Sequence, residues 1–266
     1  MKLASKVAVI TGAALGYKAG GPSIGSAIAF VFAKQGAQVV VLDINKEMGQ
    51  RTADRITASG GDALFIHTDV SSSEQIQQAV KKIHDHYGQL QCLVNCAATY
   101  QGDIFHTVVD TPEEDWLTVF DVNLHGYYRM AKYCIPLMNA SGGGSIINIS
   151  SIAARQVVPG FAVYHVTKAA INGLTRVLAV DHAPLIRTNA ICPGFVKIAN
   201  SEKDRNPEEL DQWYANIMKS YPAKRLCTVD DVAETALFLA TDASSYINGQ
   251  CLTLDSGRCI MDAHEY

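Results

Sequence analysis

The sequence predicts an α/β protein in which a doubly wound parallel sheet of seven strands carries helices on both faces. Three observations predict this fold class. Short apolar runs alternate with longer amphipathic stretches, which is typical of βαβ units. The 266 residues are 48% hydrophobic and 18% charged, which is enough apolar material for one large core. The sequence pattern contains no linker, internal repeat or low-complexity run, so we expect residues 1–266 to form a single domain.

The expected strands are short apolar runs bounded by turn residues. Because helical stretches separate them, the strands should lie parallel and be joined by right-handed crossovers. The predicted strands span residues 7–11, 38–43, 63–67, 90–95, 145–150, 187–192 and 250–255.

The expected helices lie between these strands, and several begin with capping residues. Thr111, for example, precedes Pro112 and Glu113, so suitable residues stand where the first peptide N–H groups lack helical partners. The predicted helices span residues 24–35, 45–59, 73–87, 113–139, 161–182 and 230–241. Residues 196–221 have the least regular pattern, and we expect them to form a substrate lid.

Composition excludes several classes of function. The formal net charge of -4 argues against a surface that collects nucleic-acid or lipid phosphates. No run approaches the roughly 18 apolar residues of a membrane span, and the apolar start is too short for a secretion signal. Seven scattered cysteines without paired ligand spacing predict reduced packing residues and no metal site. We therefore expect a cytoplasmic protein whose partners are small molecules, with no nucleic acid and no membrane.

A glycine-rich turn follows the first predicted strand. Gly12 and Gly16 lie in this turn, and the next helix opens at Ser23 and Ile24. Small residues allow a backbone to approach a pyrophosphate closely, and a helix N-terminus offers it oriented N–H groups. Because glycine-rich turns also occur only to reverse the chain, this signal by itself leaves both interpretations open.

A carboxylate, Asp43, ends the second predicted strand. In that position it can accept hydrogen bonds from the adenosine ribose hydroxyls and would repel a 2′-phosphate. The alternative is an aspartate that serves only a turn or a helix cap. Together with the glycine turn, Asp43 favours NAD as the cofactor, whereas Lys18 and Arg51 keep NADP open because either could pair with a phosphate.

The strongest signal is the pair Tyr164 and Lys168, which should share one face of a helix because they are four residues apart. A nearby ammonium stabilises the phenolate that a proton acceptor must become. Ser151, at the end of the fifth strand, can hydrogen-bond a substrate oxygen. Taken singly, each residue has a structural alternative: an amphipathic-helix residue, a solvated charge or a cap. Their spacing together favours catalysis.

With these residues in view, the sequence resembles the short-chain dehydrogenase/reductase family over nearly its whole length. The resemblance implies a Rossmann fold, a nicotinamide cofactor and hydride transfer at a CH–OH group. It also implies a homotetramer assembled through the helices 113–139 and 161–182 and the final strand. The motifs that carry it, besides the Tyr164–Lys168 pair and Ser151, are Thr11-Gly12 through Gly25, Asp69-Val70, Asn95-Cys96-Ala97-Ala98, Asp121-Val122-Asn123, Cys192-Pro193-Gly194, Tyr246 through Gln250 and Asp255-Ser256-Gly257.

The resemblance implies roles at the matching positions. The catalytic residues would be Asn123, Ser151, Tyr164 and Lys168, with Asn123 holding a water of the proton relay. Ser151 is chosen over its neighbour Ser150 because it fits the family's spacing to Tyr164. The cofactor would be contacted by Gly12, Gly16, Ser23, Ile24, Asp43, Asp69, Val70, Asn95, Ala97, Tyr164, Lys168, Pro193, Gly194 and Val196.

Four departures from the family pattern affect different parts of this assignment. Extra residues precede Gly25, so the equivalence of Gly16 to the family's middle glycine stays open. Ala98 adds a methyl group where a glycine usually lies beside the cofactor. Ile198 stands where a threonine usually holds the nicotinamide carboxamide, and Ser256 replaces a glycine. None of these changes removes the expected chemistry.

The expected reaction is hydride transfer between a nicotinamide cofactor and a secondary alcohol or ketone. Arg155, Gln156 and Tyr100 are the expected substrate contacts, although Arg155 could equally be a solvated loop residue. A polar sugar, polyol or hydroxy acid is favoured over a steroid. One alternative is a 3-oxoacyl thioester reductase that uses NADPH, which Asp43 disfavours. Another is a non-catalytic dinucleotide sensor, which would usually lack Tyr164 or Lys168.

Overall fold

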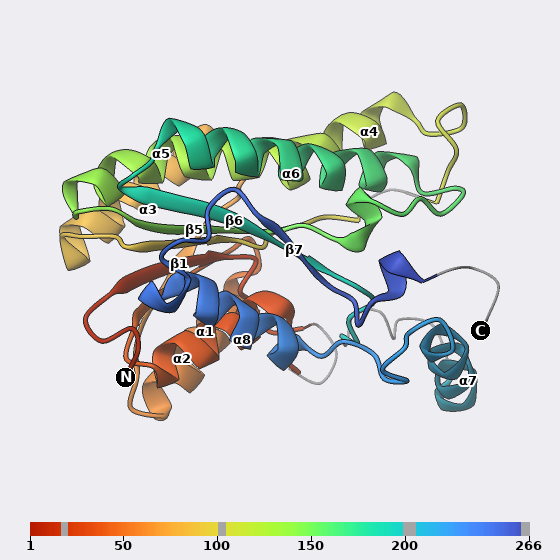
Figure 1. Cartoon of the computed structure of the whole chain (residues 1–266). Helices are drawn as coiled ribbons and strands as arrows, with labels where there is room; N and C mark the ends of the chain where they lie inside the picture. Colours follow the sequence, from red (N-terminus) through yellow and green to blue (C-terminus); the bar gives the residue numbers. More distant parts are fainter. Residues whose placement is uncertain (17–20, 101–104, 199–205, 262–266) are drawn as a thin grey trace.

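The computed structural model describes residues 1–16, 21–100, 105–198 and 206–261. Its centre is a seven-stranded parallel sheet in the order β3-β2-β1-β4-β5-β6-β7 (Figure 1). The predicted doubly wound sheet is therefore confirmed, and its strand order reverses between β1 and β4. The strands are β1 (Val7–Thr11), β2 (Gln38–Asp43), β3 (Asp62–His67), β4 (Cys92–Asn95), β5 (Gly144–Ile149), β6 (Ile186–Pro193) and β7 (Cys251–Leu254).

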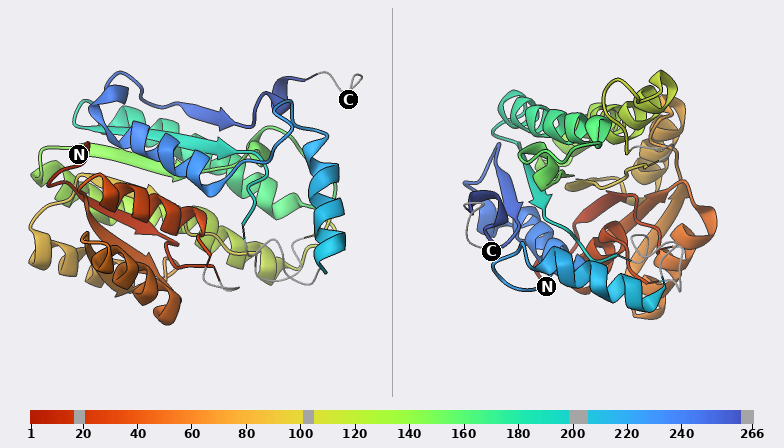
Figure 2. Two further views of the ribbon diagram at one scale, coloured as in Figure 1. Left: turned by 90° about the horizontal axis from the view of Figure 1, so that it is seen from below. Right: turned by 90° about the vertical axis from the view of Figure 1, so that its right-hand side faces the viewer.

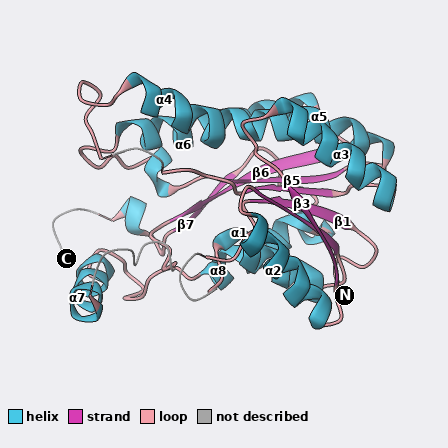
Figure 3. Cartoon of the chain, turned by 180° about the vertical axis from the view of Figure 1, so that it is seen from behind, coloured by secondary structure: helices cyan, strands magenta, loops and turns pink. Residues whose placement is uncertain are grey.

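Helices cover both faces of the sheet, as Figures 1 and 3 show. One face carries α1 (Ile24–Lys34), α2 (Lys46–Ala58) and α8 (Val229–Ala240), and the other carries α3 (Ser73–Tyr87), α5 (Gly126–Ala140) and α6 (Ala162–Asp181). Successive β2 side chains alternate between the two cores: Val39 and Val41 pack in the first, and Val40 and Leu42 in the second. Because both faces are buried, the central strands are apolar throughout, which is why they are recognisable in the sequence.

The helix predicted over residues 113–139 is interrupted. The chain forms α4 (Glu113–Phe120), then a π-helical turn, η1 (Asp121–His125), and then α5, which ends at Ala140. The prediction of one uninterrupted helix was wrong. A single wider turn retains helical backbone angles, so the periodicity of the sequence does not reveal it. Turns of this kind often lie at functional sites, and this one contains Asn123.

The segment 196–221, predicted to be irregular, contains a regular helix, α7 (Pro207–Met218). Asn206 caps it by accepting a hydrogen bond from the Glu209 N–H at 2.9 Å, and proline occupies the first helical position. α7 stands apart from the two helical layers, at one end of the molecule (Figure 2). Tyr214, Tyr221 and Leu226 form a separate small core with the α7 side chains.

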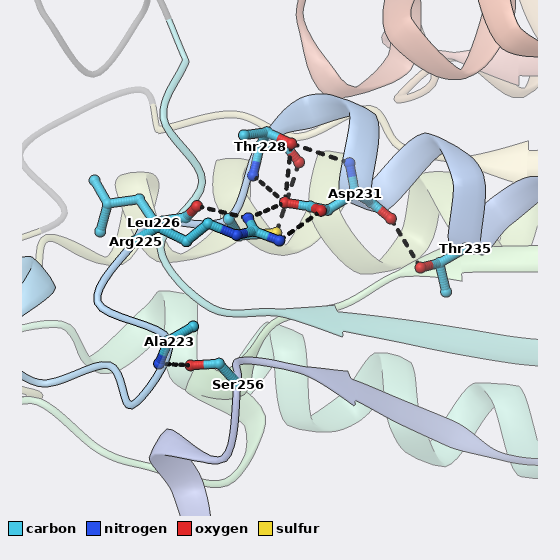
Figure 4. Close-up of polar contacts among 8 residues, drawn as sticks. Ala223, Arg225, Leu226, Thr228, Asp231, Thr235 and Ser256 are labelled. Atoms are coloured by element: carbon cyan, nitrogen blue, oxygen red, sulfur yellow. Dashed lines mark hydrogen bonds and ion pairs between the residues drawn. The ribbon is translucent and has the colours of Figure 1, made fainter.

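The chain returns from α7 to α8 through the polar network drawn in Figure 4. The Arg225 guanidinium donates two hydrogen bonds to the Asp231 carboxylate, at 2.6 and 3.0 Å, and Thr228 with Asp231 forms the capping box of α8. The Ala223 N–H donates to Ser256 Oγ at 3.3 Å, which connects this return to the end of β7. Ser256 has a φ of 53°, a left-handed conformation that explains why the family pattern has glycine here.

Acid should selectively weaken the Arg225–Asp231 contact. The hydrogen bond from Arg225 lowers the pKa of Asp231 from 3.8 to about 2. Because the folded-state pKa is depressed, this stabilisation is present above the unfolded pKa and is lost as the pH falls toward about 2. We expect Arg225→Gln to lower the free energy of unfolding only slightly at pH 7, since Arg225 is exposed and solvent screens the pair. Urea unfolding should show the difference from the parent narrowing below about pH 4; a constant difference would contradict this account.

Candidate active site

Three of the four predicted catalytic side chains come from the segment that spans β5 to α6. Ser151 follows β5, and Tyr164 and Lys168 project from the first two turns of α6. The Lys168 ammonium lies 5.6 Å from the centre of the Tyr164 ring, as expected for residues four apart on one helix. The fourth, Asn123, enters from η1. The structure therefore brings two neighbouring helices and one strand end to the same place.

Lys168 is 3% exposed, and its ammonium is held by the end of strand β5. Nζ donates a hydrogen bond to the carbonyl oxygen of Ile149, the last residue of β5, at 2.9 Å. The same carbonyl accepts a hydrogen bond from the Tyr127 hydroxyl at 3.0 Å. An ammonium has three donors, so this single backbone contact fixes its position without using its full capacity. A buried charge held in this way strongly affects the groups beside it.

The two adjacent serines differ in what they contact. Ser150 is 3% exposed and its hydroxyl donates to the Lys168 carbonyl oxygen at 3.0 Å, so this side chain anchors β5 to α6. Ser151 is half-buried and accepts a hydrogen bond from the Ala153 N–H at 3.1 Å, which begins the short 3-10 turn η2 (Ile152–Ala154). Ser151 is therefore the serine whose hydroxyl hydrogen remains available to a bound molecule, because this backbone contact does not engage it.

Asn123 is fully buried and both ends of its amide are used. Oδ1 accepts a hydrogen bond from the Thr99 N–H at 2.7 Å, and Nδ2 donates to the Thr99 carbonyl oxygen at 3.2 Å. The Asn123 amide thus bonds both backbone groups of Thr99, as a neighbouring strand would, in the segment that follows β4. Its direct effect in the structure is to position that segment beside the catalytic residues.

The predicted substrate residue Tyr100 lies against Tyr164. Its hydroxyl donates a hydrogen bond to the Tyr164 hydroxyl oxygen at 3.4 Å, and the two rings stack with centres 5.4 Å apart. The proximity of the Tyr164 hydroxyl raises the pKa of Tyr100, so Tyr100 keeps its proton. Phe161, which no sequence motif singles out, packs on Tyr164 with ring centres 4.8 Å apart.

The glycine turn after β1 has the close backbone approach that a cofactor turn requires. Gly12 has a φ of 64°, and a Cβ there would lie 2.7 Å from the Cα of Ala97. A Cβ on Gly25 would lie 2.3 Å from the carbonyl oxygen of Gly12. Thr11 supports the turn, because its Oγ1 accepts hydrogen bonds from the N–H groups of Cys96 and Ala97 at 3.0 and 3.1 Å.

The other predicted residues of this turn lie along the entrance to α1. The Gly16 N–H donates to the Gly21 carbonyl oxygen at 2.8 Å. Ser23 caps α1 by accepting from the Ser26 N–H, and its own hydroxyl donates to the Ala14 carbonyl oxygen at 2.7 Å. Ile24 is the first residue of α1, so the helix N-terminus faces the same turn. Lys18, the loop cation that kept NADP open, lies outside the described residues.

Asp43 stands at the end of β2, next to the glycine turn. One carboxylate oxygen accepts from the Ala14 N–H at 2.9 Å and the other from the Asn45 N–H at 2.8 Å. Burial raises the pKa of Asp43, and these N–H donors partly oppose the shift. The turn-forming and ribose-binding interpretations are therefore compatible, because each carboxylate oxygen can accept more than one hydrogen bond. Arg51 instead lies 3.9 Å from Glu47 on α2.

The remaining predicted cofactor contacts border the same edge of the sheet. Asp69 accepts from the Ser71 N–H and hydroxyl at 2.8 and 2.7 Å, and Val70 is 7% exposed. Asn95 donates to Asn148 Oδ1 at 2.9 Å, while its own Oδ1 is buried without a partner among the described residues. That unpaired acceptor is the one buried polar atom at this end of β4, within the described chain, that a bound group could satisfy.

The turn after β6 is also closely packed. A Cβ on Gly194 would lie 2.8 Å from the Tyr221 hydroxyl, which accepts the Phe195 N–H at 2.6 Å. Pro193 ends β6, and Val196 pairs with Cys227 in an isolated parallel bridge. Tyr221 was not predicted as part of the site, since nothing in its local sequence distinguishes it from a core tyrosine.

Arg155 and Gln156, two of the predicted substrate residues, directly follow η2. Arg155 is exposed, and the Gln156 amide donates to the Arg258 carbonyl oxygen at 3.4 Å, near the end of the chain. His165, in the first turn of α6, is 6% exposed. Its Nε2 accepts from the Val158 N–H at 3.0 Å, and its Nδ1 lies 2.6 Å from the Ala153 carbonyl oxygen. Both ring nitrogens are thus engaged in holding the loop that precedes α6.

Within the part of the chain that the structure describes, no group of three or more histidine, cysteine or acidic residues could hold a metal ion. No described helix is long and apolar enough to cross a membrane. The seven cysteines are free thiols, four of them buried, and burial raises the pKa of Cys92 and Cys134 to about 12.

Comparison with known proteins identifies the family. Residues 19–258 match a family model described as enoyl-(acyl carrier protein) reductase. An uncharacterised oxidoreductase of Thermotoga maritima is 37% identical over 97% of this chain and 98% of its own length. A 3-oxoacyl-[acyl-carrier-protein] reductase of the same organism is 34% identical over 98% of this chain and 100% of its own length.

Solved structures give the same result. A ligand-free aldohexose dehydrogenase of Thermoplasma acidophilum is 30% identical, with a TM-score of 0.87 over 99% of this chain and 98% of the other. A short-chain type dehydrogenase/reductase of Mycobacterium ulcerans is 27% identical, with a TM-score of 0.86 over 98% of this chain and 92% of the other. The chain therefore belongs to the short-chain dehydrogenase/reductase family and has its Rossmann fold.

Proposed function

We propose that this oxidoreductase interconverts a secondary alcohol and a ketone with NAD as its cofactor. The observation that carries the proposal is the Tyr164 ring, whose centre lies 5.6 Å from the buried Lys168 ammonium, with Ser151 at the end of the neighbouring strand. A phenol next to a fixed cation can accept the hydroxyl proton of an alcohol, and a serine hydroxyl can orient the same oxygen. These are the two tasks that alcohol oxidation requires of the protein.

The backbone cradle fits a dinucleotide. At Gly12 and Gly25 the backbone packs so closely that a Cβ would collide with neighbouring backbone atoms, and the α1 N-terminus supplies peptide N–H groups beside this turn. Asp43 would hold the adenosine ribose, and Asp69 with Val70 would border the adenine. Asn95, Ala97 and the turn formed by Pro193, Gly194 and Val196 would line the nicotinamide side. The adenine and nicotinamide contacts follow from the matching family positions and are part of the proposal.

NAD, when bound, supplies the carbon that accepts or donates the hydride. In the proposed mechanism, Ser151 donates a hydrogen bond to the substrate oxygen and fixes its direction. Tyr164 takes the hydroxyl proton during oxidation and returns it during reduction. Lys168 stabilises the resulting phenolate and binds the nicotinamide ribose, while Asn123 holds the water through which the proton reaches solvent. The protein thus positions the reactants and moves one proton.

The proposed substrate is a polar sugar, polyol or hydroxy acid, with Tyr100, Arg155 and Gln156 at the cleft mouth. The structural similarity to an aldohexose dehydrogenase supports a sugar-like substrate. The second candidate is reduction of a 3-oxoacyl thioester with NADPH, which the 34% identity to a protein of that name supports. A non-catalytic dinucleotide sensor is the third candidate, and it is opposed by the complete set of Ser151, Tyr164 and Lys168.

The test is absorbance at 340 nm during incubation of the protein with NAD or NADP and a panel of sugars, polyols, hydroxy acids and simple secondary alcohols. NADH formation with one class would support the proposal. Consumption of NADPH with a 3-oxoacyl thioester alone would favour the second candidate. Absence of any reaction, together with NAD binding by calorimetry, would favour the sensor.

Two further features belong to this proposal. Residues 196–221, with α7, would act as the substrate lid, because both flanks of this segment meet the turn after β6.

The protein would assemble as a homotetramer through α5, α6 and β7. Apolar side chains exposed along the outer face of α6 support such an interface: Val166, Val177 and Val180 are 43%, 55% and 78% exposed.

Asp43→Ala should reduce the preference for NAD over NADP. Removal of a charged hydrogen-bond acceptor costs roughly 1.5–3 kcal/mol, so the KM for NAD should rise about tenfold or more while that for NADP changes less. Steady-state kinetics with both cofactors measures the ratio, and a thermal melt checks that loss of the Ala14 and Asn45 contacts leaves the protein folded. Arg51→Ala is the matched control, and it should leave both KM values unchanged. A fall in NADP affinity on that change would instead assign Arg51 to a 2′-phosphate.

A further inference from the structure

Four aromatic rings form a continuous row beside the catalytic hydroxyl. In order they are Phe105, Phe161, Tyr164 and Tyr100, with successive ring centres 5.0, 4.8 and 5.4 Å apart. Successive ring planes are inclined by 9°, 32° and 28°, so the contacts at the two ends of the row are stacked and the one between Phe161 and Tyr164 is tilted. The rings come from two separate segments, the one after β4 and the start of α6. We refer to these four residues as the aromatic row.

The ends of the aromatic row are open to solvent. Tyr100 is 54% exposed and Phe105 is 74% exposed, although large apolar rings are usually buried. The loop before α6 runs alongside, because a Cβ on Gly160 would lie 3.7 Å from the Phe105 carbonyl oxygen. In this loop Val157 and Val158 are 78% and 56% exposed. Apolar groups gathered in this way, next to a catalytic group, indicate a binding surface.

The loop is held in place by His165. This side chain accepts the Val158 N–H and contacts the Phe161 ring at a centre distance of 5.8 Å. The loop and the aromatic row are therefore one packed unit around the first turn of α6. At its other end, the Tyr100 hydroxyl lies 3.4 Å from the Tyr164 oxygen, so the Tyr100 ring borders the place where a reacting oxygen must lie.

From this arrangement we propose that the aromatic row selects substrates whose reacting carbon belongs to a ring, over open-chain compounds of the same carbon number. The inference rests on the proposed function, because the selected molecule is the one on which Tyr164 acts. A ring presents a flat C–H face that can pack against exposed aromatic faces. It also has few rotatable bonds to fix on binding, whereas an open chain of equal size loses more conformational freedom.

Binding without turnover tests the selection directly. Cyclohexanone and 3-hexanone contain the same number of carbons, and the enzyme with NAD in its oxidised form cannot reduce either ketone. Titrations followed by ligand-observed NMR, with and without NAD, should give a Kd for cyclohexanone at least about tenfold lower. Equal affinities, or tighter binding of 3-hexanone, would overturn the proposal.

Variants locate the effect in the aromatic row. Tyr100→Leu should raise the Kd for cyclohexanone about tenfold and leave that for 3-hexanone nearly unchanged, whereas Tyr100→Phe should retain the difference because it keeps the ring. Tyr246→Leu is the matched control, since Tyr246 is a fully exposed tyrosine on the segment before β7. Equal losses for the two ketones in Tyr100→Leu would mean that the row only supports the helix and would contradict ring selection.

The outcomes separate this inference from the proposed function. If matched cyclic and open-chain alcohols are oxidised with equal kcat/KM and their ketones bind equally, ring selection fails and the dehydrogenase proposal stands. If no alcohol is oxidised and no ketone reduced but cyclohexanone binds preferentially, the dehydrogenase proposal fails and ring selection stands.

Discussion

Tyr164→Phe is expected to lower kcat for alcohol oxidation by about 10² to 10⁴, the range that positioned acid–base groups contribute. The change removes only the hydroxyl that exchanges the substrate proton. The ring remains between Phe161 and Tyr100, so packing at the start of α6 should be preserved. NADH formation, measured with whichever alcohol proves active, gives the rate, and calorimetry should show NAD binding within a few-fold of the parent.

Tyr127→Phe provides a matched control for this prediction. Tyr127 is also a buried tyrosine near Lys168, which lies 5.9 Å from its ring centre, and its hydroxyl donates to the Ile149 carbonyl oxygen. Tyr127 is 1% exposed, so loss of its hydroxyl should lower stability by about 1 kcal/mol and kcat by less than tenfold. If Tyr164→Phe kept more than a tenth of the parent rate, or if the two variants were equally slow, Tyr164 would not be the acid–base group.

Gly25→Ala should have the second large effect, on both stability and cofactor binding. The added Cβ would lie 2.3 Å from the Gly12 carbonyl oxygen and 2.8 Å from its carbonyl carbon. Both atoms are backbone, so the turn or α1 must move. We expect the free energy of unfolding to fall by about 3 kcal/mol, at the upper end of overpacking effects, and NAD affinity to fall by more than about tenfold. Urea unfolding and calorimetry measure the two quantities.

Gly173→Ala is the control because it places the same methyl group in a helix with open space. A Cβ on Gly173, in the interior of α6, would have no atom of a neighbouring described residue within 4 Å. Alanine is the better helix former, so within the protomer this variant should be neutral or up to about 1 kcal/mol more stable. Because Gly173 shares a face of α6 with Val166 and Val180, sedimentation should first show that the assembly state is unchanged. If Gly25→Ala behaved like Gly173→Ala, the close approach of α1 to the β1 turn would not be essential.

The parts of the structure that the sequence could predict are those governed by short-range periodicity. The central strands are buried on both faces, and apolar runs identified all seven strands. The spacing of Tyr164 and Lys168 placed both on one face of α6. The wider turn at Asn123 was not predictable from the sequence. It allows Asn123 to bond the backbone of Thr99, and that contact depends on how η1 packs against the segment after β4. Similarly, the helix α7 was missed although Asn206 and the following proline formed a start signal, since the polar composition of that segment outweighed it.

Side-chain roles that depend on partners distant in the sequence could not be predicted either. His165 directly follows Tyr164, and no local pattern shows that its two ring nitrogens are engaged by Ala153 and Val158. The aromatic row joins Phe105 to Phe161, which are far apart in the sequence and carry no local motif. Such contacts are decided by tertiary packing, which periodicity and motif spacing do not encode.

The pairing of Val196 with Cys227 has a consequence for how substrate range can diverge among related enzymes. The two residues hold together the two ends of the segment that contains α7, so this segment leaves the sheet and returns to it at the same place. The entropic cost of closing such a loop grows only slowly with its length. Insertions and deletions within it should therefore be tolerated with little loss of stability, while Ser151, Tyr164 and Lys168 stay fixed on β5 and α6. Evolution could in this way change what the enzyme accepts without changing the chemistry that it performs.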